Sequence, residues 1–265
     1  MFRLENFMGK RILTSSFLDG EAVRAFFTTR DLPLKSGERE DLIKDVENNK
    51  KLLCEGFNIP LNNLIIPIQT HSDNVKIVNG KRETLNGNEQ NLSSFASHLS
   101  PLENTDALVT NEKNLALALN FADCVPIIFF DPVKKVTAIA HAGWRGTVAK
   151  IAPKTVEKMV KNFSSKPKDI IALIGPAIGK CCFEVQDDVK TKLLDTIEKP
   201  YQEQVCNANR IDLKLINKLQ LLANGVEKID LCEYCTFCQS ELFFSYRREN
   251  GKTARHSAVV TISKR

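Results

Sequence analysis

Short apolar runs and longer amphipathic stretches alternate along the chain. Apolar runs at residues 64–68, 75–78, 107–110, 115–120, 126–131 and 136–142 have the length and composition of β-strands. The gaps between the last three runs are too short for a crossover helix, which parallel neighbours would require. The pattern therefore predicts a sheet that is at least partly antiparallel.

Four other stretches repeat their apolar positions at helical spacing. They are residues 40–57, 147–163, 187–198 and 212–224, the last capped by Asp212 and closed by Gly225. Strands at 169–174, 241–247 and 257–262 would complete the sheet, and the polar segment 79–100 is predicted to be a loop. We expect one domain over residues 1–265, an α/β (α+β) fold with a mixed, partly antiparallel sheet covered by helices.

The composition and charge of the chain indicate which class of molecule it binds. The 265 residues are 43% apolar, and 37 basic and 32 acidic residues leave a net charge of +5. The two signs are mixed along the sequence, which indicates a solvated surface and not a nucleic-acid-binding face. The small positive excess favours an anionic small molecule such as phosphate.

The sequence pattern is not that of a secreted or membrane protein, so we expect the protein in the cytoplasm. Glu5 lies where a signal peptide would have its apolar core, and the most apolar run, 125–130, is far shorter than the ~20 residues that span a bilayer. We therefore expect neither secretion nor membrane insertion. The eight cysteines are then interpreted as thiols, metal ligands or a nucleophile.

Residues with metal-binding chemistry lie at the ends of predicted strands, where sites commonly form. His71, Cys124 and His141 offer two imidazoles and a thiolate, a suitable ligand set for zinc with a fourth position open to water or substrate. The alternative from spacing alone is that Cys124 is a small buried apolar residue and His141 a core residue bonded to backbone.

Three motifs closely resemble the YfiH family. They are Ala-Asp-Cys-Val-Pro at 122–126, His-Ala-Gly-Trp-Arg-Gly-Thr at 141–147 and Ile-Gly-Pro-Ala-Ile-Gly-Lys-Cys-Cys-Phe-Glu-Val at 174–185. Similar segments at 69–71, 106–110, 212–215 and 243–248 extend the resemblance over nearly the whole chain.

The resemblance implies an enzyme of purine nucleosides and phosphate. Members were first described as multicopper polyphenol oxidases, or laccases, and later as purine nucleoside phosphorylases with adenosine deaminase and methylthioadenosine phosphorylase activity. Zinc on His71, Cys124 and His141 is implied. A four-copper centre needs many more histidines than the four in this chain, although copper can still occupy such a site in vitro.

Four further residues are site candidates. Arg145, at the start of the predicted 147–163 helix, is a candidate phosphate ligand or else a surface ion-pair residue. Asp123 would orient a ligand, act as acid or base, or cap a turn. Gln69 would bind substrate or close a turn. Arg30 matches the family's early Thr-Arg, but Asp-Leu-Pro follows it where Gly-Gly-Val is typical, which weakens a role in substrate contact.

The remaining cysteines leave a second metal site open. Cys232-x-x-Cys235-x-x-Cys238 has zinc-knuckle spacing without an evident fourth ligand. Cys181 and Cys182 are adjacent, and we interpret them as thiols because a disulfide between neighbours would be strained.

Two other functions are compatible with the same residues. In the first, Cys124 is a nucleophile with His141 as its base, as in a cysteine hydrolase or amidase that edits peptidoglycan precursors, a role ascribed to some relatives. In the second, the chain is a non-catalytic partner of cell-division or envelope machinery. Tightly bound zinc would indicate that Cys124 is a metal ligand and not a nucleophile. A non-catalytic partner would keep its function in Cys124→Ala.

Overall fold

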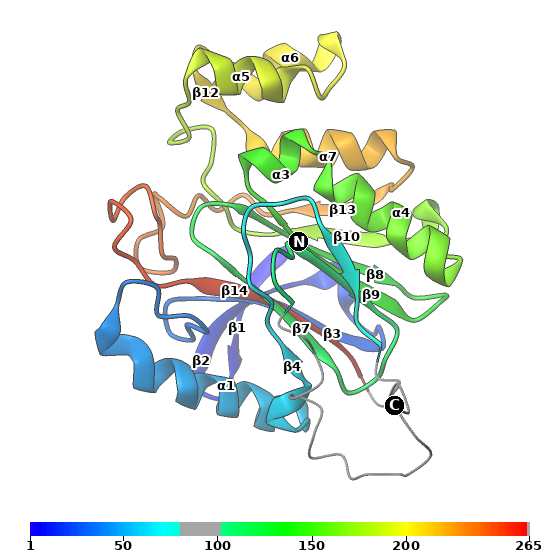
Figure 1. Cartoon of the computed structure of the whole chain (residues 1–265), viewed down its shortest axis with the longest axis vertical. Helices are drawn as coiled ribbons and strands as arrows, with labels where there is room; N and C mark the ends of the chain where they lie inside the picture. Colours follow the sequence, from blue (N-terminus) through cyan, green and yellow to red (C-terminus); the bar gives the residue numbers. More distant parts are fainter. Residues whose placement is uncertain (80–101, 264–265) are drawn as a thin grey trace.

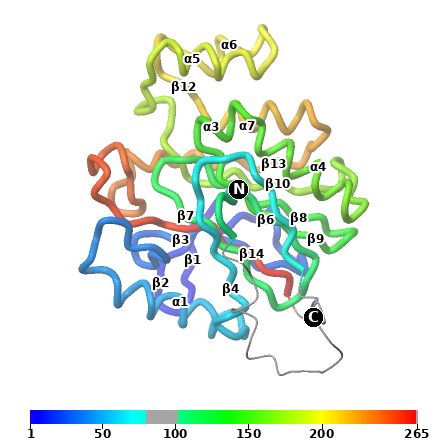
Figure 2. Tube along the Cα trace, in the orientation of Figure 1, coloured from blue at the N-terminus to red at the C-terminus, as the bar shows by residue number. Residues whose placement is uncertain are grey.

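The computed structural model describes residues 1–79 and 102–263, and within these ranges the strands form two six-stranded sheets and a small ribbon. The first sheet has the order β1 (Phe2–Phe7), β2 (Lys10–Ser15), β3 (Val23–Thr28), β14 (His256–Ile262), β7 (Ala116–Phe121) and β4 (Leu64–Ile65). Only its β4–β7 pair is parallel. Figure 2 shows β14, from the end of the chain, running beside strands from its beginning.

The second sheet contains the remaining long strands. Its order is β13 (Lys228–Leu231), β10 (Ile171–Ile174), β8 (Val125–Asp131), β9 (Val136–Ala142), β6 (Ala107–Thr110) and β5 (Val75–Ile77). The outer pairs β13–β10 and β6–β5 are parallel, whereas the inner pairs are antiparallel. The ribbon pairs β11 (Cys206–Asn207) with β12 (Arg210–Ile211).

Helices cover the outer faces of both sheets (Figure 1). They are α1 (Ile43–Phe57), α3 (Trp144–Val148), α4 (Ile151–Phe163), α5 (Asp187–Leu194), α6 (Lys199–Val205) and α7 (Leu213–Ala223), with short 3-10 turns η1 (Ser16–Leu18), η2 (Glu40–Leu42), η3 (Leu61–Asn63) and η5 (Pro167–Asp169). Helix α1 lies on the first sheet, α4 and α7 lie on the second, and α5 and α6 lie beyond α3 and α7.

Three apolar clusters join these layers. The middle cluster lies between the sheets, where Phe27 and Leu119 of the first sheet pack with Phe130 of the second. One outer cluster joins α1 to the first sheet, and the other joins α4 and α7 to the second. Because both faces of the central strands are covered, strands such as β8 are buried at every position and have continuous apolar runs.

The structure confirms the α/β class with mixed sheets and the exact bounds expected for β6 and β9. It divides the strands between two sheets, which the apolar pattern did not reveal. The expected strand at 241–247 is wrong, because these residues form turns in which the Arg247 amide N–H donates to the Asp123 carboxylate. The loop expected at 79–100 lies outside the described residues except for Asn79.

The helix expected at 147–163 is two helices. It starts earlier, at Trp144, and is interrupted at Lys150, which has a left-handed backbone with φ of 59°. Helix α5 also ends earlier than expected, at Leu194. Helix α7 follows the prediction: the Asp212 carboxylate accepts from the Leu215 amide, and Gly225, with φ of 83°, follows the end of the helix.

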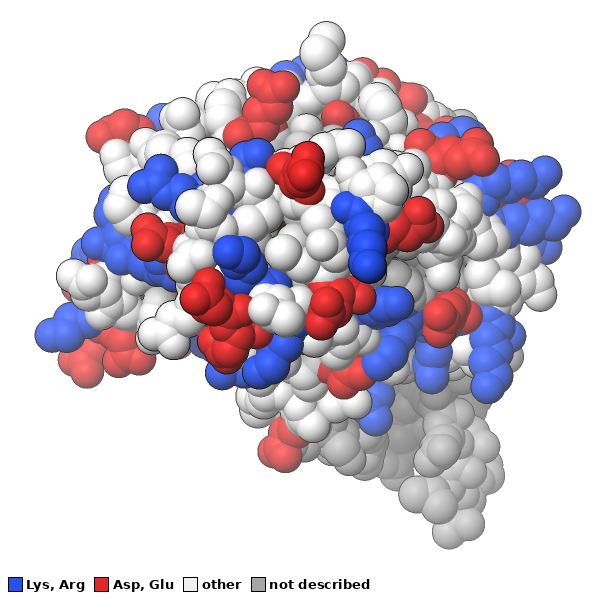
Figure 3. All heavy atoms as spheres, turned by 90° about the horizontal axis from the view of Figure 1, so that it is seen from above, with Lys and Arg blue, Asp and Glu red and all other residues white. Residues whose placement is uncertain are grey.

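The surface carries both charges. On the face seen in Figure 3, lysine and arginine side chains are interspersed with aspartate and glutamate, as the sequence indicated. Among residues 1–79 and 102–263, no helix is both long enough and apolar enough to cross a bilayer.

Candidate metal centre

Strand register brings the candidate ligands together. In the β8–β9 hairpin, Pro126 pairs with His141 and Val125 pairs with Ala142, so Cys124, just before β8, lies beside the end of β9. Residues that are distant in sequence are neighbours because the two strands are antiparallel. His71 comes from the loop between β4 and β5, where it adopts a left-handed backbone with φ of 62°.

The structure brings all three predicted ligands into one cluster. One donor atom each from His71, Cys124 and His141 lie within 4.8 Å of one another. The His71 and His141 rings meet edge to face, with centroids 4.8 Å apart. His141 is buried, Cys124 half-buried and His71 exposed, so the cluster is open on the His71 side. An open three-ligand site of this composition suits a catalytic zinc ion.

Gly143 leaves room for this cluster. A Cβ atom at residue 143 would lie 3.0 Å from Cys124 Sγ and 3.1 Å from His71 Cδ2. Any larger side chain would therefore push two of the three donors apart. The glycine and the donor set together fit a bound metal ion.

Asp106 holds both histidines in place. Its Oδ1 lies 2.8 Å from His141 Nδ1, and its carboxylate accepts from the backbone amides of Thr70, His71 and Ser72. A carboxylate bonded to one imidazole nitrogen leaves the other nitrogen free as a ligand. Asp106 is fully buried, which makes this arrangement rigid.

Charge at the cluster favours a thiolate. Burial opposes ionisation of Cys124, but the charge of His141 and hydrogen bonds from His141 and His71 lower its pKa to about 6. Burial likewise opposes a charged His141, whereas Cys124 and Asp106 raise the pKa of its imidazole. A thiolate is the form of cysteine that binds a metal or attacks a substrate.

Asp123 ties two distant loops to the cluster. Its carboxylate accepts from Thr236 Oγ1 at 2.6 Å, from Ser245 Oγ at 3.0 Å and from the Arg247 amide at 2.7 Å. Its backbone is left-handed, with φ of 87°. These bonds hold the turn that presents Cys124, and the buried carboxylate faces protein donors.

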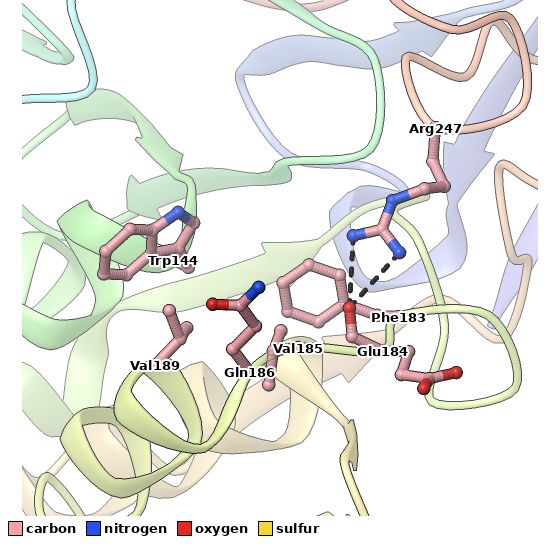
Figure 4. Close-up of a pocket in the computed structure, with 7 residues that line it drawn as sticks. All are labelled: Trp144, Phe183, Glu184, Val185, Gln186, Val189 and Arg247. Carbon is pink, nitrogen blue, oxygen red and sulfur yellow. Dashed lines mark hydrogen bonds between the residues drawn. The ribbon is translucent and has the colours of Figure 1, made fainter.

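Trp144, directly after Gly143, lines a pocket of about 520 Å³. Figure 4 shows Trp144 on one side and Phe183 on the other, with the Gln186 amide between them. The Arg247 guanidinium donates to the Glu184 carbonyl at the rim. The three candidate ligands do not line this pocket, which is connected to them through residues 141–147 and the Asp123–Arg247 hydrogen bond.

The other candidates lie in different surroundings. Arg145 is exposed and stacks on Trp144 at 4.3 Å, and it makes no ion pair within the part of the chain that the structure describes. Both amide atoms of Gln69 bond the Asn120 backbone. Arg30 pairs with Glu249 at 2.9 Å and stacks over Phe244 at 4.4 Å. Gln69 and Arg30 are thus engaged by protein groups.

Sequence reasoning did not single out Asp106, Gly143 or Arg255. Asp106 was noticed only within a motif, although a lone acid directly before an apolar strand is a usable signal. Arg255 is half-buried, and burial lowers the pKa of its guanidinium against the opposing negative charges of Cys124, Glu38 and Asp123. A cation close to the cluster is relevant to an anionic substrate.

The α/β fold of two packed sheets thus carries an open His-Cys-His cluster that could hold a metal ion. The chain belongs to the family described as "Multi-copper polyphenol oxidoreductase laccase", whose model matches residues 23–263. The solved structure of a Bacillus licheniformis protein titled YfiH matches with a TM-score of 0.83 and 33% identity, covering 99% of each chain. The YfiH resemblance is thereby confirmed.

Named relatives agree on nucleoside chemistry. The purine nucleoside phosphorylase YlmD of Bacillus subtilis is 37% identical over 221 residues, which cover 82% of this chain and 77% of that protein. The adenosine deaminase RL5, from an unknown prokaryotic organism, is 32% identical over 252 residues, or 88% of this chain and 92% of that protein.

Proposed function

We propose that this chain is a zinc-dependent purine nucleoside phosphorylase that also deaminates adenosine, working as one catalytic unit. The observation that carries the proposal is the convergence of His71, Cys124 and His141 within 4.8 Å, open on one side. The names of the relatives, which include both activities, support the same reaction class.

The pocket beside Trp144 has the properties needed for a purine. Its volume of about 520 Å³ lies within the range of small-molecule sites. Trp144 and Phe183 offer aromatic faces to a flat base, and the Gln186 amide offers a donor and an acceptor to its edge. In this arrangement the purine nucleoside binds in the pocket beside the His71, Cys124 and His141 cluster.

Phosphate needs a cation that is not neutralised by the protein. Arg145 meets this requirement, because its guanidinium stacks on Trp144 and forms no ion pair with residues 1–79 or 102–263. Helix α3 has only five residues, so the phosphate site rests on the guanidinium and not on a helix dipole. Arg255, influenced by the charge of Cys124, is a second cation on this side. In the proposal Arg30 and Gln69 position loops through their protein contacts.

The two reactions share one centre. A bound zinc ion would supply Lewis acidity, which lowers the pKa of water and polarises the substrate. In phosphorolysis a phosphate oxygen forms a bond to ribose C1′ as the bond from C1′ to the purine nitrogen breaks. In deamination water adds at C6 of adenosine and ammonia leaves, giving inosine. His141, held by Asp106, fixes the geometry, and Asp123 fixes the turn of Cys124.

Product analysis tests the proposal. Metal-quantified wild-type protein, Cys124→Ala and Cys206→Ala are incubated with adenosine, with and without phosphate, and the bases and nucleosides are separated. Cys206 is a matched control, since it lies in the β11–β12 ribbon outside both cysteine-containing clusters and its thiol donates to the Ala208 carbonyl. We expect adenine that depends on phosphate, and inosine, from wild type and the control, and at least ~100-fold less from Cys124→Ala. No turnover by zinc-loaded wild type would reject the assignment.

A second candidate rests on the pairing of Cys124 with His141 and of His141 with Asp106. A thiol of lowered pKa, a base and an orienting carboxylate are also the parts of a cysteine hydrolase or amidase, including one that edits peptidoglycan precursors. Rapid alkylation of Cys124 in protein without metal would favour this alternative, whereas tightly held zinc that protects the thiol would favour the nucleoside enzyme.

The proposal also names the metal and the cellular compartment of the enzyme. The family name refers to copper oxidases, but this chain has four histidines in total, and the described residues gather two of them at the candidate centre. Zinc is therefore the proposed metal. We place the enzyme in the cytoplasm, because a reducing compartment protects Cys124 from oxidation and so keeps it able to bind zinc.

A further inference from the structure

Four other cysteines converge away from the first cluster. Cys181 and Cys182 lie in the loop after β10, and Cys235 and Cys238 lie in the loop after β13. Their sulfur atoms all lie within 4.8 Å of one another. The Cys238 Sγ is 3.4 Å from that of Cys182 and 3.7 Å from that of Cys181. No ligand is shared with His71, Cys124 and His141.

The spacing of these sulfurs matches a tetrahedral metal site. A zinc ion bonded to four thiolates at ~2.3 Å holds each pair of sulfurs ~3.8 Å apart. A disulfide would instead need ~2.05 Å between bonded sulfurs. The measured separations of 3.4 and 3.7 Å lie close to the edge length of the tetrahedron, and all four thiols are unpaired.

The backbone around Cys235 is already arranged for a thiolate. The Gly179 amide donates to Cys235 Sγ at 3.2 Å, and the Cys238 amide makes a second bond to the same sulfur. Such N–H donors to sulfur stabilise its charged form, and the Cys-x-x-Cys spacing permits both cysteines to ligate one ion. The pairing of Ala177 with Cys235 fixes the two loops against each other.

Arg248 holds the turn between Cys235 and Cys238 in place. The Arg248 guanidinium donates to the carbonyls of Thr236 and Phe237, which lie between Cys235 and Cys238. The same guanidinium pairs with the Glu249 carboxylate at 2.8 Å, so its contribution to the candidate site is to fix the turn that carries Cys235 and Cys238.

Cys232 does not belong to the group, although the sequence places it in the same Cys-x-x-Cys-x-x-Cys run. It is buried in the core between the sheets, and its carbonyl accepts from Lys214 Nζ. The third and fourth ligands come instead from the adjacent pair Cys181 and Cys182, more than fifty residues earlier in the chain.

We propose that Cys181, Cys182, Cys235 and Cys238 bind a second zinc ion in a closed, structural site. With four protein ligands the ion has no open position for substrate. It fastens the loop that carries Phe183 and Gln186 of the pocket to the loop whose Thr236 bonds Asp123. The site therefore stabilises the wall of the pocket, and the proposal is independent of the reaction catalysed at the first cluster.

Zinc content tests the proposal. Untagged protein purified under reducing conditions is analysed by elemental mass spectrometry for wild type, Cys181→Ser/Cys238→Ser, His71→Ala/His141→Ala, and a Cys232→Ser control. We expect two zinc ions per chain in wild type and the control, and one in each double variant. One zinc in wild type that only the histidine substitutions remove would overturn the second site, and iron in place of zinc would overturn its metal identity.

A measurement on the unmodified chain covers the case in which the variants fail to fold. Wild-type protein is alkylated before and after a strong zinc chelator, and the labelled cysteines are mapped by mass spectrometry. We expect Cys181 and Cys238, which are exposed, to be protected until the chelator is added, while half-buried Cys206 reacts at the same rate in both samples. Immediate labelling of Cys181 and Cys238, or a disulfide within the group, would contradict the proposal.

Discussion

One buried carboxylate, that of Asp106, supports both imidazoles of the candidate metal centre. It bonds His141 Nδ1 directly and holds His71 through the backbone amides of residues 70–72. Burial opposes its charge, yet the hydrogen bonds from His141 and Ser72 lower the pKa of Asp106 to about 2. The aspartate is thus an anion at neutral pH, which strengthens His141 as a ligand.

Asp106→Asn tests this role. The amide keeps the size of the side chain but removes its charge and turns an N–H₂ group toward protein donors, so we expect zinc affinity to fall ~10–100-fold. Competition with a coloured chelator measures the affinity. The exposed Asp195 offers a matched control, Asp195→Asn, which should bind zinc as wild type does. Equal affinity in both variants would show that Asp106 serves only the fold.

His256 is a titratable residue that the proposed chemistry does not use. It is fully buried in β14 beside Phe243, with ring centroids 5.3 Å apart, and neither ring nitrogen has a well-formed hydrogen bond within the described chain. Burial, with the nearby charges of Arg255, Arg30 and Arg248, lowers its pKa to about 3, against a slight opposing effect of the Pro176 carbonyl.

The depressed pKa predicts sensitivity to acid. The unfolded chain binds the proton first, near pH 6.5, so the contribution of His256 is complete above that pH and is lost as the pH falls toward 3. Between pH 7 and 5 the free energy of unfolding should fall by roughly 2 kcal/mol more in wild type than in His256→Leu. Urea unfolding of both proteins at each pH measures the difference, and parallel losses would contradict the prediction.

At the scale of elements, the hairpin of β8 and β9 brings together two of the three candidate metal ligands. Its turn at residues 132–135 sets the register, which places His141 opposite Pro126 and therefore near Cys124. The two strands and the short turn between them were predictable from sequence. The proximity of Cys124 and His141 could therefore have been predicted as well. The position of His71 was not, because it depends on a loop held by Asp106 through long-range bonds.

Several elements could not be predicted from the local pattern of apolar and polar residues. The strands β1 to β3 and β13 were not predicted, since residues such as Arg3 and Glu5 interrupt the apolar pattern of an exposed edge strand. The segment 241–247 is apolar enough for a strand, but its polar groups form hydrogen bonds with Asp123, Arg248 and Glu249 instead of with a neighbouring strand. The four-cysteine group was hidden because its halves are far apart in the chain.

The break between α3 and α4 gives a test at this scale. Lys150 has a left-handed backbone, with φ of 59°, which costs a residue with a Cβ atom more than glycine. We expect Lys150→Gly to raise the free energy of unfolding by about 0.5 kcal/mol. The same substitution inside α4, Lys158→Gly, should lower it by about 1 kcal/mol. Chemical denaturation compares the two, and destabilisation by both would refute the interpretation.

At the scale of the whole molecule, helices and two sheets form four layers, with the middle apolar cluster shared by both sheets. Sequence composition and the alternation of strands and helices were sufficient for the α/β class. The number of sheets could not be predicted from them. A strand that is buried on both faces has no alternation of apolar and polar residues, so its sequence does not show which sheet it joins.

The position of β14 in the first sheet, between β3 and β7, constrains how the chain is made. Residues 23–28 need a partner that the ribosome delivers only at residues 256–262. At ~5–20 residues per second, that interval is on the order of ten to fifty seconds. During it the nascent first sheet has an unpaired edge, which is open to pairing with other chains. Completion of the first sheet therefore waits until residues 256–262 have left the ribosome, and until then chaperone binding would protect the exposed edge of β3.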